Sequence, residues 1–216
     1  MTDRISPGLW RLHVLTDRKA SRGRSHLQVA QAAIAGGADV IQLRDKDASS
    51  GGLYREALQL RTLTREAKVP FIVNDRLDIA LAVDADGVHV GQSDLPASVA
   101  RKILGPGKIL GVSVVTVEEA LRAEKDGADY LGVGPVFEAR GTKPDTGEPK
   151  GVDCITRIRR HCRLPIVAIG GINADNARKV RDAGADAAAV ISAIVSADDI
   201  EQAASRLKRI LEGTGQ

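Results

Sequence analysis

The chain has 216 residues, of which 43% are hydrophobic, 27% charged and only 2% aromatic, and its formal net charge is +3. These values are ordinary for a globular protein, and the length suits one α/β barrel. The few aromatic residues argue against a nucleic-acid partner bound by base stacking. No apolar segment approaches about 18 residues, and the start MTDRISPGLW has no signal-peptide core, so we expect a cytoplasmic protein without a membrane partner.

The mildly basic balance has two interpretations. The Lys and Arg residues are spread along the chain, so they can form an ordinary solvated surface, or they can favour a phosphorylated substrate. Cys154 and Cys162 lie eight residues apart, without a metal-binding or redox spacing. We expect both thiols to be reduced.

Eight short apolar runs, rich in Val and Ile, predict eight strands. In chain order they are RLHVLT (11–16), VIQL (40–43), FIVN (71–74), GVHV (87–90), ILGVS (109–113), YLGVG (130–134), IVAIG (166–170) and AAAVIS (187–192). The longer segments between them have helical spacing. One of these, SHLQVAQAAIAGG, ends in Gly36-Gly37, which is a typical helix C-cap signal.

Four of the junctions before these strands share one pattern. The segments GGADVIQL, VDADGVHV, DGADYLGV and AGADAAAV each read as a helix end, then Ala-Asp, then a strand, which indicates a repeated βα unit. Eight such units predict a single-domain α/β protein, a (β/α)8 TIM barrel over residues 1–216 with the barrel at about 11–211. The alternative is a doubly wound open sheet, whose first turn usually carries GxGxxG; here that turn reads TDRKASRG.

In such a barrel the residues that follow the strands meet on one face, where active sites of this fold lie. Three chemical groups are expected there. Arg44, Lys46 and Lys143 are cations that can bind phosphate. Asp75 and Asp94 follow neighbouring strands, and a carboxylate pair without thiolate or imidazole ligands favours Mg²⁺.

The third group is glycine-rich backbone, IGGIN after the seventh strand and VISAI after the eighth. These two loops often form a phosphate cup in barrels. The face therefore predicts a metal-and-cation site for a diphosphate and a separate cup for a monophosphate. Because the sequence has no obvious activated nucleophile, we expect catalysis by stabilising charge on a departing diphosphate.

Each feature also has a purely structural interpretation. Asp75 and Asp94 could cap the helices that follow them. Residues 44–47 could be a solvated loop paired within itself, and Gly170-Gly171 could serve close packing alone. His89 lies on an apolar strand, and we interpret it as a hydrogen-bonded core or rim residue rather than a base.

Taken together and in order, the motifs resemble one known family. HVLTD, QLRDKD, VNDR, DGVHVGQSD, LGVS, YLGVGPVF followed by TKPD, IVAIGGI and VISAI are similar to those of thiamine-phosphate synthase, from about residue 12 to about residue 211. The resemblance implies a (β/α)8 barrel and a Mg²⁺-dependent transferase. Such an enzyme joins a pyrimidine-methyl diphosphate to a thiazole phosphate and releases pyrophosphate.

The resemblance also implies roles for individual residues. Asp75 and Asp94 would bind Mg²⁺, and Ser113 and Lys143 would act at the reacting centre. The substrate-binding residues would be Gln42, Arg44, Lys46, Asn74, Ser113, Thr142, Lys143, Gly171, Ile191 and Ser192. Gln42 would lie near the pyrimidine, and Gly171, Ile191 and Ser192 would hold the thiazole phosphate. The partners would be two phosphorylated small molecules, with a homo-oligomer possible.

One loop departs from the family pattern. Where the family usually has GPVF followed by Pro-Thr-x-Thr-Lys, this chain has GPVFEARGTK, one residue longer, with Ala139 or Arg140 in place of the first threonine. Other hypotheses are a thiazole tautomerase-like relative, a phosphosugar isomerase and a non-catalytic phosphometabolite-binding barrel. The tautomerase-like relative would keep the phosphate cup and lose the metal and diphosphate set, which is present here.

Overall fold

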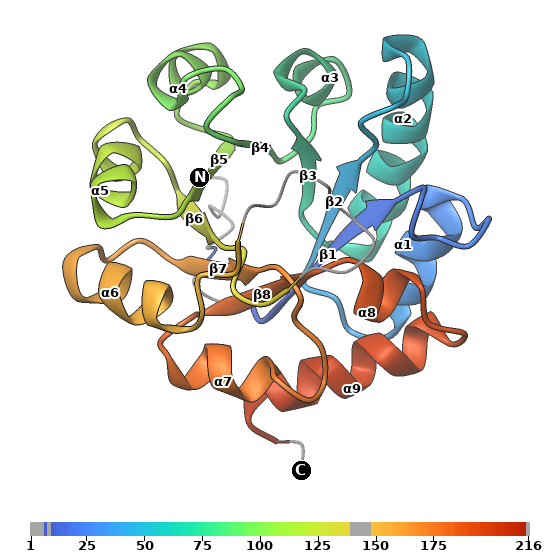
Figure 1. Cartoon of the computed structure of the whole chain (residues 1–216). Coiled ribbons are helices and arrows are strands. Elements are labelled where there is room, and N and C mark those ends of the chain that lie inside the picture. The colour runs from blue at the N-terminus through green and yellow to red at the C-terminus, as the bar shows by residue number, and fades with distance from the viewer. Residues whose placement is uncertain (1–6, 8–9, 139–147, 215–216) are drawn as a thin grey trace.

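The computed structural model describes residues 7, 10–138 and 148–214, and within them eight parallel strands close into one barrel (Figure 1). The strands are β1 (Leu12–Asp17), β2 (Val40–Arg44), β3 (Phe71–Asn74), β4 (Gly87–Val90), β5 (Ile109–Val114), β6 (Tyr130–Val133), β7 (Ile166–Ile169) and β8 (Ala187–Val190). Each strand pairs with the next one in the chain, and β8 pairs with β1. The predicted (β/α)8 barrel is confirmed, and every predicted strand is present, its ends within two residues.

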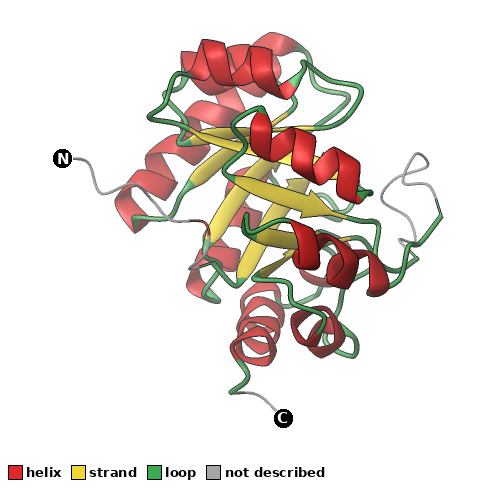
Figure 2. Ribbon diagram, turned by 90° about the vertical axis from the view of Figure 1, so that its left-hand side faces the viewer, coloured by secondary structure: helices red, strands yellow, loops and turns green. Residues whose placement is uncertain are grey.

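Helices surround the strands on the outside of the barrel (Figure 2). They are α1 (His26–Ala35), α2 (Ser50–Ala67), α3 (Leu77–Ala82), α4 (Ala97–Leu104), α5 (Val117–Lys125), α6 (Asp153–His161), α7 (Ala177–Asp182), α8 (Ser192–Val195) and α9 (Ile200–Glu212). Because the strands are covered on both faces, they read as continuous apolar runs rather than alternating ones. No described helix is long and apolar enough to cross a membrane.

Local sequence signals set the helix ends. Ser25 caps α1 and Thr116 caps α5, and in both helices a Gln or Glu three residues later completes a capping box. The helix α1 ends at Gly36, as its sequence predicts, and Gly37 takes a positive φ of 91° that favours glycine.

The repeated Ala-Asp junction is a clamp at the amino-terminal end of the barrel. The carboxylate of Asp129, which precedes β6, accepts the backbone N–H of Leu110 in β5 at 2.8 Å. The backbone N–H of Asp129 in turn donates to the carbonyl oxygen of Leu110 at 2.7 Å. Arg101 of α4 pairs with the same carboxylate at 2.5 Å and donates to the carbonyl of Gly127. One aspartate thus joins two strands and a helix.

The same clamp occurs at all four copies of the junction. The carboxylates of Asp39, Asp86 and Asp186 accept backbone N–H groups at the beginning of β1, β3 and β7 respectively. Their cations come from Lys208 of α9, Arg61 of α2 and Arg159 of α6. Each clamp therefore fixes an odd-numbered strand to the even-numbered strand that follows it.

Removing one clamp should destabilise the whole barrel. Asp129→Ala leaves the buried N–H of Leu110 without its acceptor and Arg101 without its partner carboxylate. We expect the free energy of unfolding to fall by about 2–4 kcal/mol, because hydrogen bonds to charged groups are strong and the groups left behind are poorly solvated.

The matched control is Asp182→Ala, which removes an exposed ion pair with Arg181. It should change the free energy of unfolding by no more than about 0.5 kcal/mol. Urea denaturation of both variants measures the difference. Equal losses in the two variants would contradict the clamp.

Candidate active site

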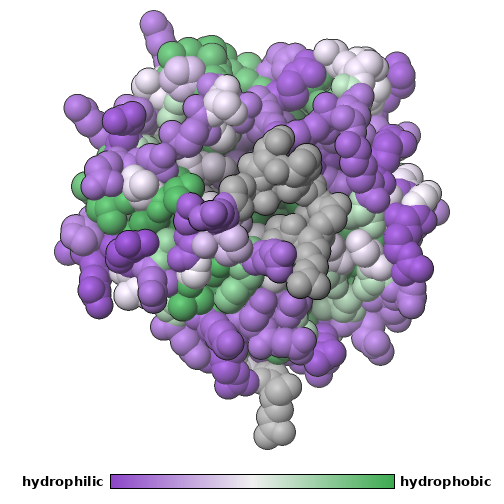
Figure 3. Space-filling model, viewed as in Figure 1, coloured by the Kyte–Doolittle hydropathy of each residue, from purple (hydrophilic) through white to green (hydrophobic). Residues whose placement is uncertain are grey.

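A cavity of about 220 Å³ opens among the carboxyl-terminal halves of the strands and the loops that follow them. Six of the residues expected at the site from the sequence line it: Gln42, Asn74, Ser113, Gly171, Ile191 and Ser192. Four of these six have polar side chains, so the cavity is a partly polar pocket that reaches the barrel end where active sites of this fold lie. Hydrophilic side chains also predominate around the edge of the molecule as seen in Figure 3.

Aromatic and imidazole rings form the inner part of the cavity, and the sequence-based reasoning missed two of them. His13 and Tyr130 line the cavity and are each 1% exposed. Trp10 contacts both rings edge-on, with ring centroids 6.0 Å and 5.6 Å away. The signal was a histidine inside the apolar run RLHVLT, because a polar residue in a strand covered on both faces must face a partner or a cavity.

Burial controls the ionisation of these rings. Burial, and secondarily the charge of nearby His89, lowers the pKa of His13 from 6.5 to about 3. Burial also raises the pKa of Tyr130 above its ordinary value. At neutral pH the inner cavity therefore presents a neutral imidazole and a neutral phenol.

The cation of Arg44, expected to hold diphosphate, lies in a buried ion pair. Its guanidinium contacts the carboxylate of Asp17, and the two residues are 6% and 4% exposed. The pair follows from the barrel register, because Asp17 on β1 lies directly beside Arg44 on β2. The Nε atom of Arg44 is buried and has no hydrogen-bond partner among the described residues.

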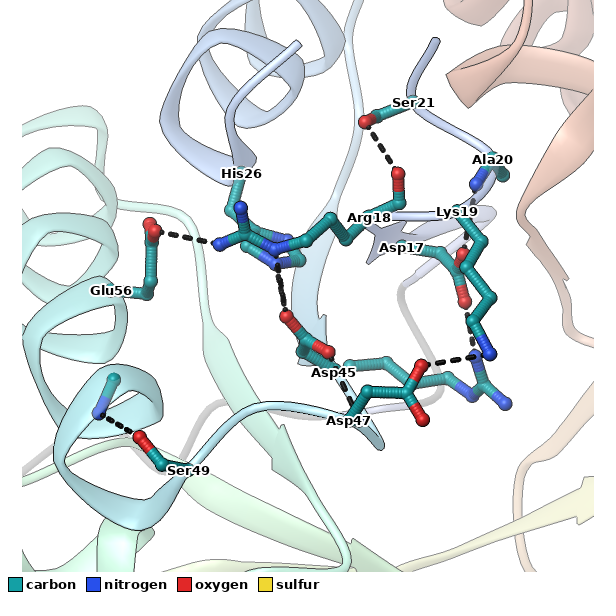
Figure 4. A network of polar contacts seen from close by, with 12 residues as sticks. Asp17, Arg18, Lys19, Ala20, Ser21, His26, Asp45, Asp47, Ser49 and Glu56 are labelled. Atoms are coloured by element: carbon teal, nitrogen blue, oxygen red, sulfur yellow. Dashed lines mark hydrogen bonds and ion pairs between the residues drawn. The ribbon is translucent and has the colours of Figure 1, made fainter. Parts of the chain in front are cut away.

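The loops after β1 and β2 are bound together by further ion pairs (Figure 4). Asp45 accepts from Arg18 at 3.0 Å and lies 3.4 Å from Nε2 of His26, while Lys19 pairs with Asp47 at 2.7 Å. The ion pairs of segment 44–47 therefore reach outside the segment, and one hydrogen bond lies within it, from the Asp47 N–H to the Asp45 carboxylate at 3.2 Å. Lys46 differs from its neighbours because it extends from this loop toward Asp75, with Nζ 4.0 Å from Oδ2.

Asp75 has an unusual backbone conformation. Its φ of 62° is left-handed, a region that Asp and Asn tolerate better than most residues. Its N–H donates to the carbonyl of His89 at 2.8 Å, which extends the pairing of β3 and β4 by one residue. The N-cap of α3 is Arg76, so the capping interpretation of Asp75 is wrong. The strained position holds a carboxylate at the edge of the cavity face.

Asp94 stabilises the turn after β4. Its carboxylate accepts the N–H of Gly91 at 2.7 Å, and its own N–H donates to the carbonyl of Gly91 at 3.2 Å. The N-cap of α4 is Pro96, so Asp94 does not cap that helix either. One oxygen of Asp94 is thereby oriented by the backbone, on the strand end next to that of Asp75.

The two carboxylates are a hard-oxygen donor set of the kind that Mg²⁺ prefers. Among the residues that the structure describes, no three His, Cys, Asp or Glu side chains are grouped to hold a metal. Asp75 and Asp94 alone would therefore leave most coordination positions to waters and ligand oxygens. That arrangement fits Mg²⁺ bound together with a phosphorylated ligand.

The glycines after β7 serve both packing and conformation. Gly170 and Gly171 have positive φ values of 103° and 64°. A side chain on Gly171 would come within 2.5 Å of the Glu138 carbonyl, and one on Gly170 within 2.7 Å of Pro135. Close packing at both glycines is therefore confirmed, but they do not serve packing alone, because Gly171 also lines the cavity. The remaining predicted residues of the β6 loop, Thr142 and Lys143, lie outside the described residues, as do Ala139 and Arg140.

After β8 the chain turns directly into the short helix α8. Ile191 is its N-cap residue and Ser192 its first residue, and both line the cavity. The helix is held against the first βα loop, because the Ser196 hydroxyl donates to the Ala20 carbonyl at 2.9 Å. The loops after β7 and β8 thus meet on one side of the cavity, across the barrel from Asp75 and Asp94.

Fold and cavity together define a (β/α)8-barrel enzyme with a polar site at the carboxyl ends of its strands. The family model for thiamine monophosphate synthase matches residues 12–194. A thiamine-phosphate synthase of Chloroflexus aurantiacus is 58% identical over 205 residues, which are 95% of this chain and 94% of the relative. A thiamine-phosphate synthase of Methanocella arvoryzae is 56% identical, covering 93% of this chain and 94% of the relative.

A solved structure agrees with this similarity. The thiamine phosphate pyrophosphorylase of Pyrococcus furiosus superimposes with a TM-score of 0.88 at 44% identity, over 96% of this chain and 98% of that one. The chain belongs to the thiamine-phosphate synthase family, as its motifs predict, and it is a transferase of that family.

The buried neutral His13 should make stability depend on pH. The unfolded chain protonates His13 near pH 6.5, whereas the folded protein does so only near pH 3. Because the folded-state pKa is the lower one, His13 does not change the free energy of unfolding above pH 6.5. Below that value it lowers the free energy of unfolding by about 1.4 kcal/mol per pH unit. Between pH 7.5 and pH 5.0 the free energy of unfolding of His13→Gln should therefore fall by about 2 kcal/mol less than that of the parent protein.

Urea denaturation at the two pH values measures this difference. The control is His161→Gln, which replaces an exposed histidine and should follow the parent protein. Parallel pH profiles for the parent protein and His13→Gln would show that His13 is not held neutral.

Proposed function

We propose that this enzyme joins 4-amino-5-hydroxymethyl-2-methylpyrimidine diphosphate to 4-methyl-5-(2-phosphooxyethyl)thiazole, giving thiamine phosphate and pyrophosphate. The C–O bond between the pyrimidine methylene and the diphosphate breaks first, and the electron pair leaves with pyrophosphate. The thiazole nitrogen then forms the new C–N bond with its lone pair. The observation that carries this proposal is one cavity flanked on one side by cations and carboxylates and on the other by glycine-rich loops.

The cationic side suits the diphosphate. Lys46 is exposed and reaches toward Asp75, so its ammonium can turn to phosphate oxygens once Asp75 binds the metal. Arg44 keeps Asp17 as its partner, and its guanidinium would add positive charge on this side of the cavity. Asn74, at the end of β3, adds a side-chain amide that lines the cavity. These groups would favour the diphosphate as its negative charge grows during departure.

The carboxylates Asp75 and Asp94 are the residues that would hold Mg²⁺. When bound, the ion would supply positive charge that neutralises the leaving diphosphate. The contribution of the chain is orientation. The left-handed backbone at Asp75 and the Gly91 N–H on Asp94 fix where the two carboxylates lie before any ligand arrives.

The inner cavity suits the pyrimidine ring. Gln42 is 2% exposed and lines the cavity, so its amide can recognise the polar edge of the ring. The neighbouring His13 and Tyr130 are neutral at pH 7, which avoids repelling a positively charged pyrimidine-methyl cation. The inner walls also keep water from the cation, which would otherwise be captured as an alcohol.

The opposite side of the cavity suits the thiazole phosphate. Gly171, Ile191 and Ser192 lie on the loops after β7 and β8, where barrels commonly bind phosphate with backbone N–H groups. Thr142 and Lys143 belong to the same proposal by their family motif. Two ligands held on opposite sides would place the thiazole nitrogen near the methylene carbon, and this proximity accelerates the second step.

The proposal includes a cytoplasmic enzyme that acts on two phosphorylated small molecules. Cys154 and Cys162 are free and buried, and burial raises the pKa of both thiols. Neither thiol is therefore prepared to act as a nucleophile at neutral pH.

The activity itself is testable with purified protein. Pyrophosphate should be released only when both substrates and Mg²⁺ are present, because the thiazole nitrogen is needed to capture the cation. A coupled pyrophosphate assay measures the release, and mass spectrometry identifies thiamine phosphate. Absence of pyrophosphate release under these conditions would contradict the proposed function.

The metal role of Asp75 is testable by a variant that keeps the backbone. Asp75→Asn preserves a residue that tolerates φ of 62° but removes the charge. We expect kcat to fall at least about 100-fold and the Mg²⁺ concentration for half-maximal rate to rise at least about tenfold.

Asp78→Asn is the matched control. Asp78 lies three residues after Asp75, and it is an exposed carboxylate paired with Arg76. It should retain the parent rate and Mg²⁺ dependence. If Asp75→Asn behaved like this control, Asp75 would not be a metal ligand.

A further inference from the structure

A chain of hydrogen bonds runs through the inner cavity from β6 over β4 to β5. The Tyr130 hydroxyl lies 2.9 Å from Nδ1 of His89. Nε2 of His89 lies 2.9 Å from the hydroxyl oxygen of Ser113. Three side chains from three neighbouring strands are thus linked, and beside them the Nε2 atoms of Gln42 and His13 lie 3.3 Å apart.

Elementary donor and acceptor rules give this chain a direction. The hydroxyl of Tyr130 has one hydrogen-bond partner among the described residues, Nδ1 of His89. The buried phenol of Tyr130 keeps its proton and donates it to Nδ1 of His89. A neutral imidazole that accepts at Nδ1 carries its hydrogen on Nε2, so His89 donates to Ser113. The Ser113 hydrogen is then directed to another acceptor.

The barrel is shaped to admit these rings. His89 on β4, Gly111 on β5 and Tyr130 on β6 lie in one layer by register. A side chain on Gly111 would come within 2.5 Å of the imidazole and within 2.2 Å of the phenol. One on Gly132 would come within 2.7 Å of the imidazole. The two glycines leave the space through which His89 reaches both Tyr130 and Ser113.

We propose that His89 is a positioning residue that acts through Ser113. Tyr130 holds it in the tautomer with hydrogen on Nε2, and that hydrogen makes the Ser113 oxygen an acceptor. The Ser113 hydroxyl is thereby fixed as a donor into the cavity, which it lines. This inference rests on the proposed function, and it assigns an oxygen of the departing diphosphate as the acceptor of the Ser113 hydrogen. A serine turned the other way would present its lone pairs to that anion.

A double-mutant cycle tests whether His89 acts through Ser113. We expect His89→Leu to lower kcat about 10- to 100-fold, because a hydrogen bond to a charged group is lost, and to change KM much less. His89→Gln offers an amide donor and should recover a large part of the rate. In a Ser113→Ala background, His89→Leu and His89→Gln should each change kcat less than about twofold.

If His89→Leu lowered kcat in the Ser113→Ala background by the same factor as in the parent protein, His89 would act independently of Ser113. That result would overturn the proposal. Should His89→Leu fail to fold, the measurement of the imidazole tautomer in the next paragraph still tests the proposal. The double-mutant cycle requires a parent protein that releases pyrophosphate. A parent protein that releases none contradicts the proposed function, and this result is obtained before any variant is compared.

The imidazole tautomer gives a second measurement that does not depend on activity. Nitrogen-15 NMR of the labelled protein should show His89 protonated on Nε2 and unprotonated on Nδ1 at neutral pH. Tyr130→Phe should shift the Nδ1 signal by removing its donor. Finding the hydrogen on Nδ1 would overturn the proposal, whatever the enzyme's activity.

Discussion

The four aspartate clamps at the amino-terminal end of the barrel are the constraint on which the rest of the structure depends. Each carboxylate ties an N–H at the beginning of one strand to the beginning of the next strand and pairs with a cation from an outer helix. These clamps fix where adjacent strands begin relative to each other. The hydrogen bonds between the paired strands keep that register up to the carboxyl-terminal end of the barrel. The site lies there, so its geometry is set by contacts at the opposite side of the molecule.

The sequence was sufficient for the strands, the closed barrel and the face that carries the site. Short apolar runs and a repeated junction are local signals, and a repeated βα unit can close in few ways. The role of the repeated aspartate was not predictable in the same way. The backbone N–H that donates to it lies 27 residues back for Asp39, 15 for Asp86, 19 for Asp129 and 20 for Asp186, so only the folded register brings the two together.

The site was predictable as a set of residues but not as a set of partners. Neighbouring strand ends placed Asp75 and Asp94 on one face, yet helix capping could not be excluded until the caps proved to be Arg76 and Pro96. The pairing of Arg44 with Asp17 depends on β1 and β2 lying in register. Likewise, the contact of His89 with Tyr130 passes over Gly111, and only three-dimensional register shows that a missing side chain makes room for it.

Pairing among the charges of the site has a consequence for how it would bind ligands. Arg44 is matched by Asp17, Lys19 by Asp47 and Lys46 by Asp75, so the loops present little excess positive charge. A diphosphate arriving alone would have to separate Lys46 from Asp75 and leave a carboxylate beside an anion. In the proposed reaction Asp75 serves as metal ligand instead, and Lys46 then has only phosphate as its partner. Diphosphate and metal should therefore bind cooperatively, because each removes the countercharge that opposes the other.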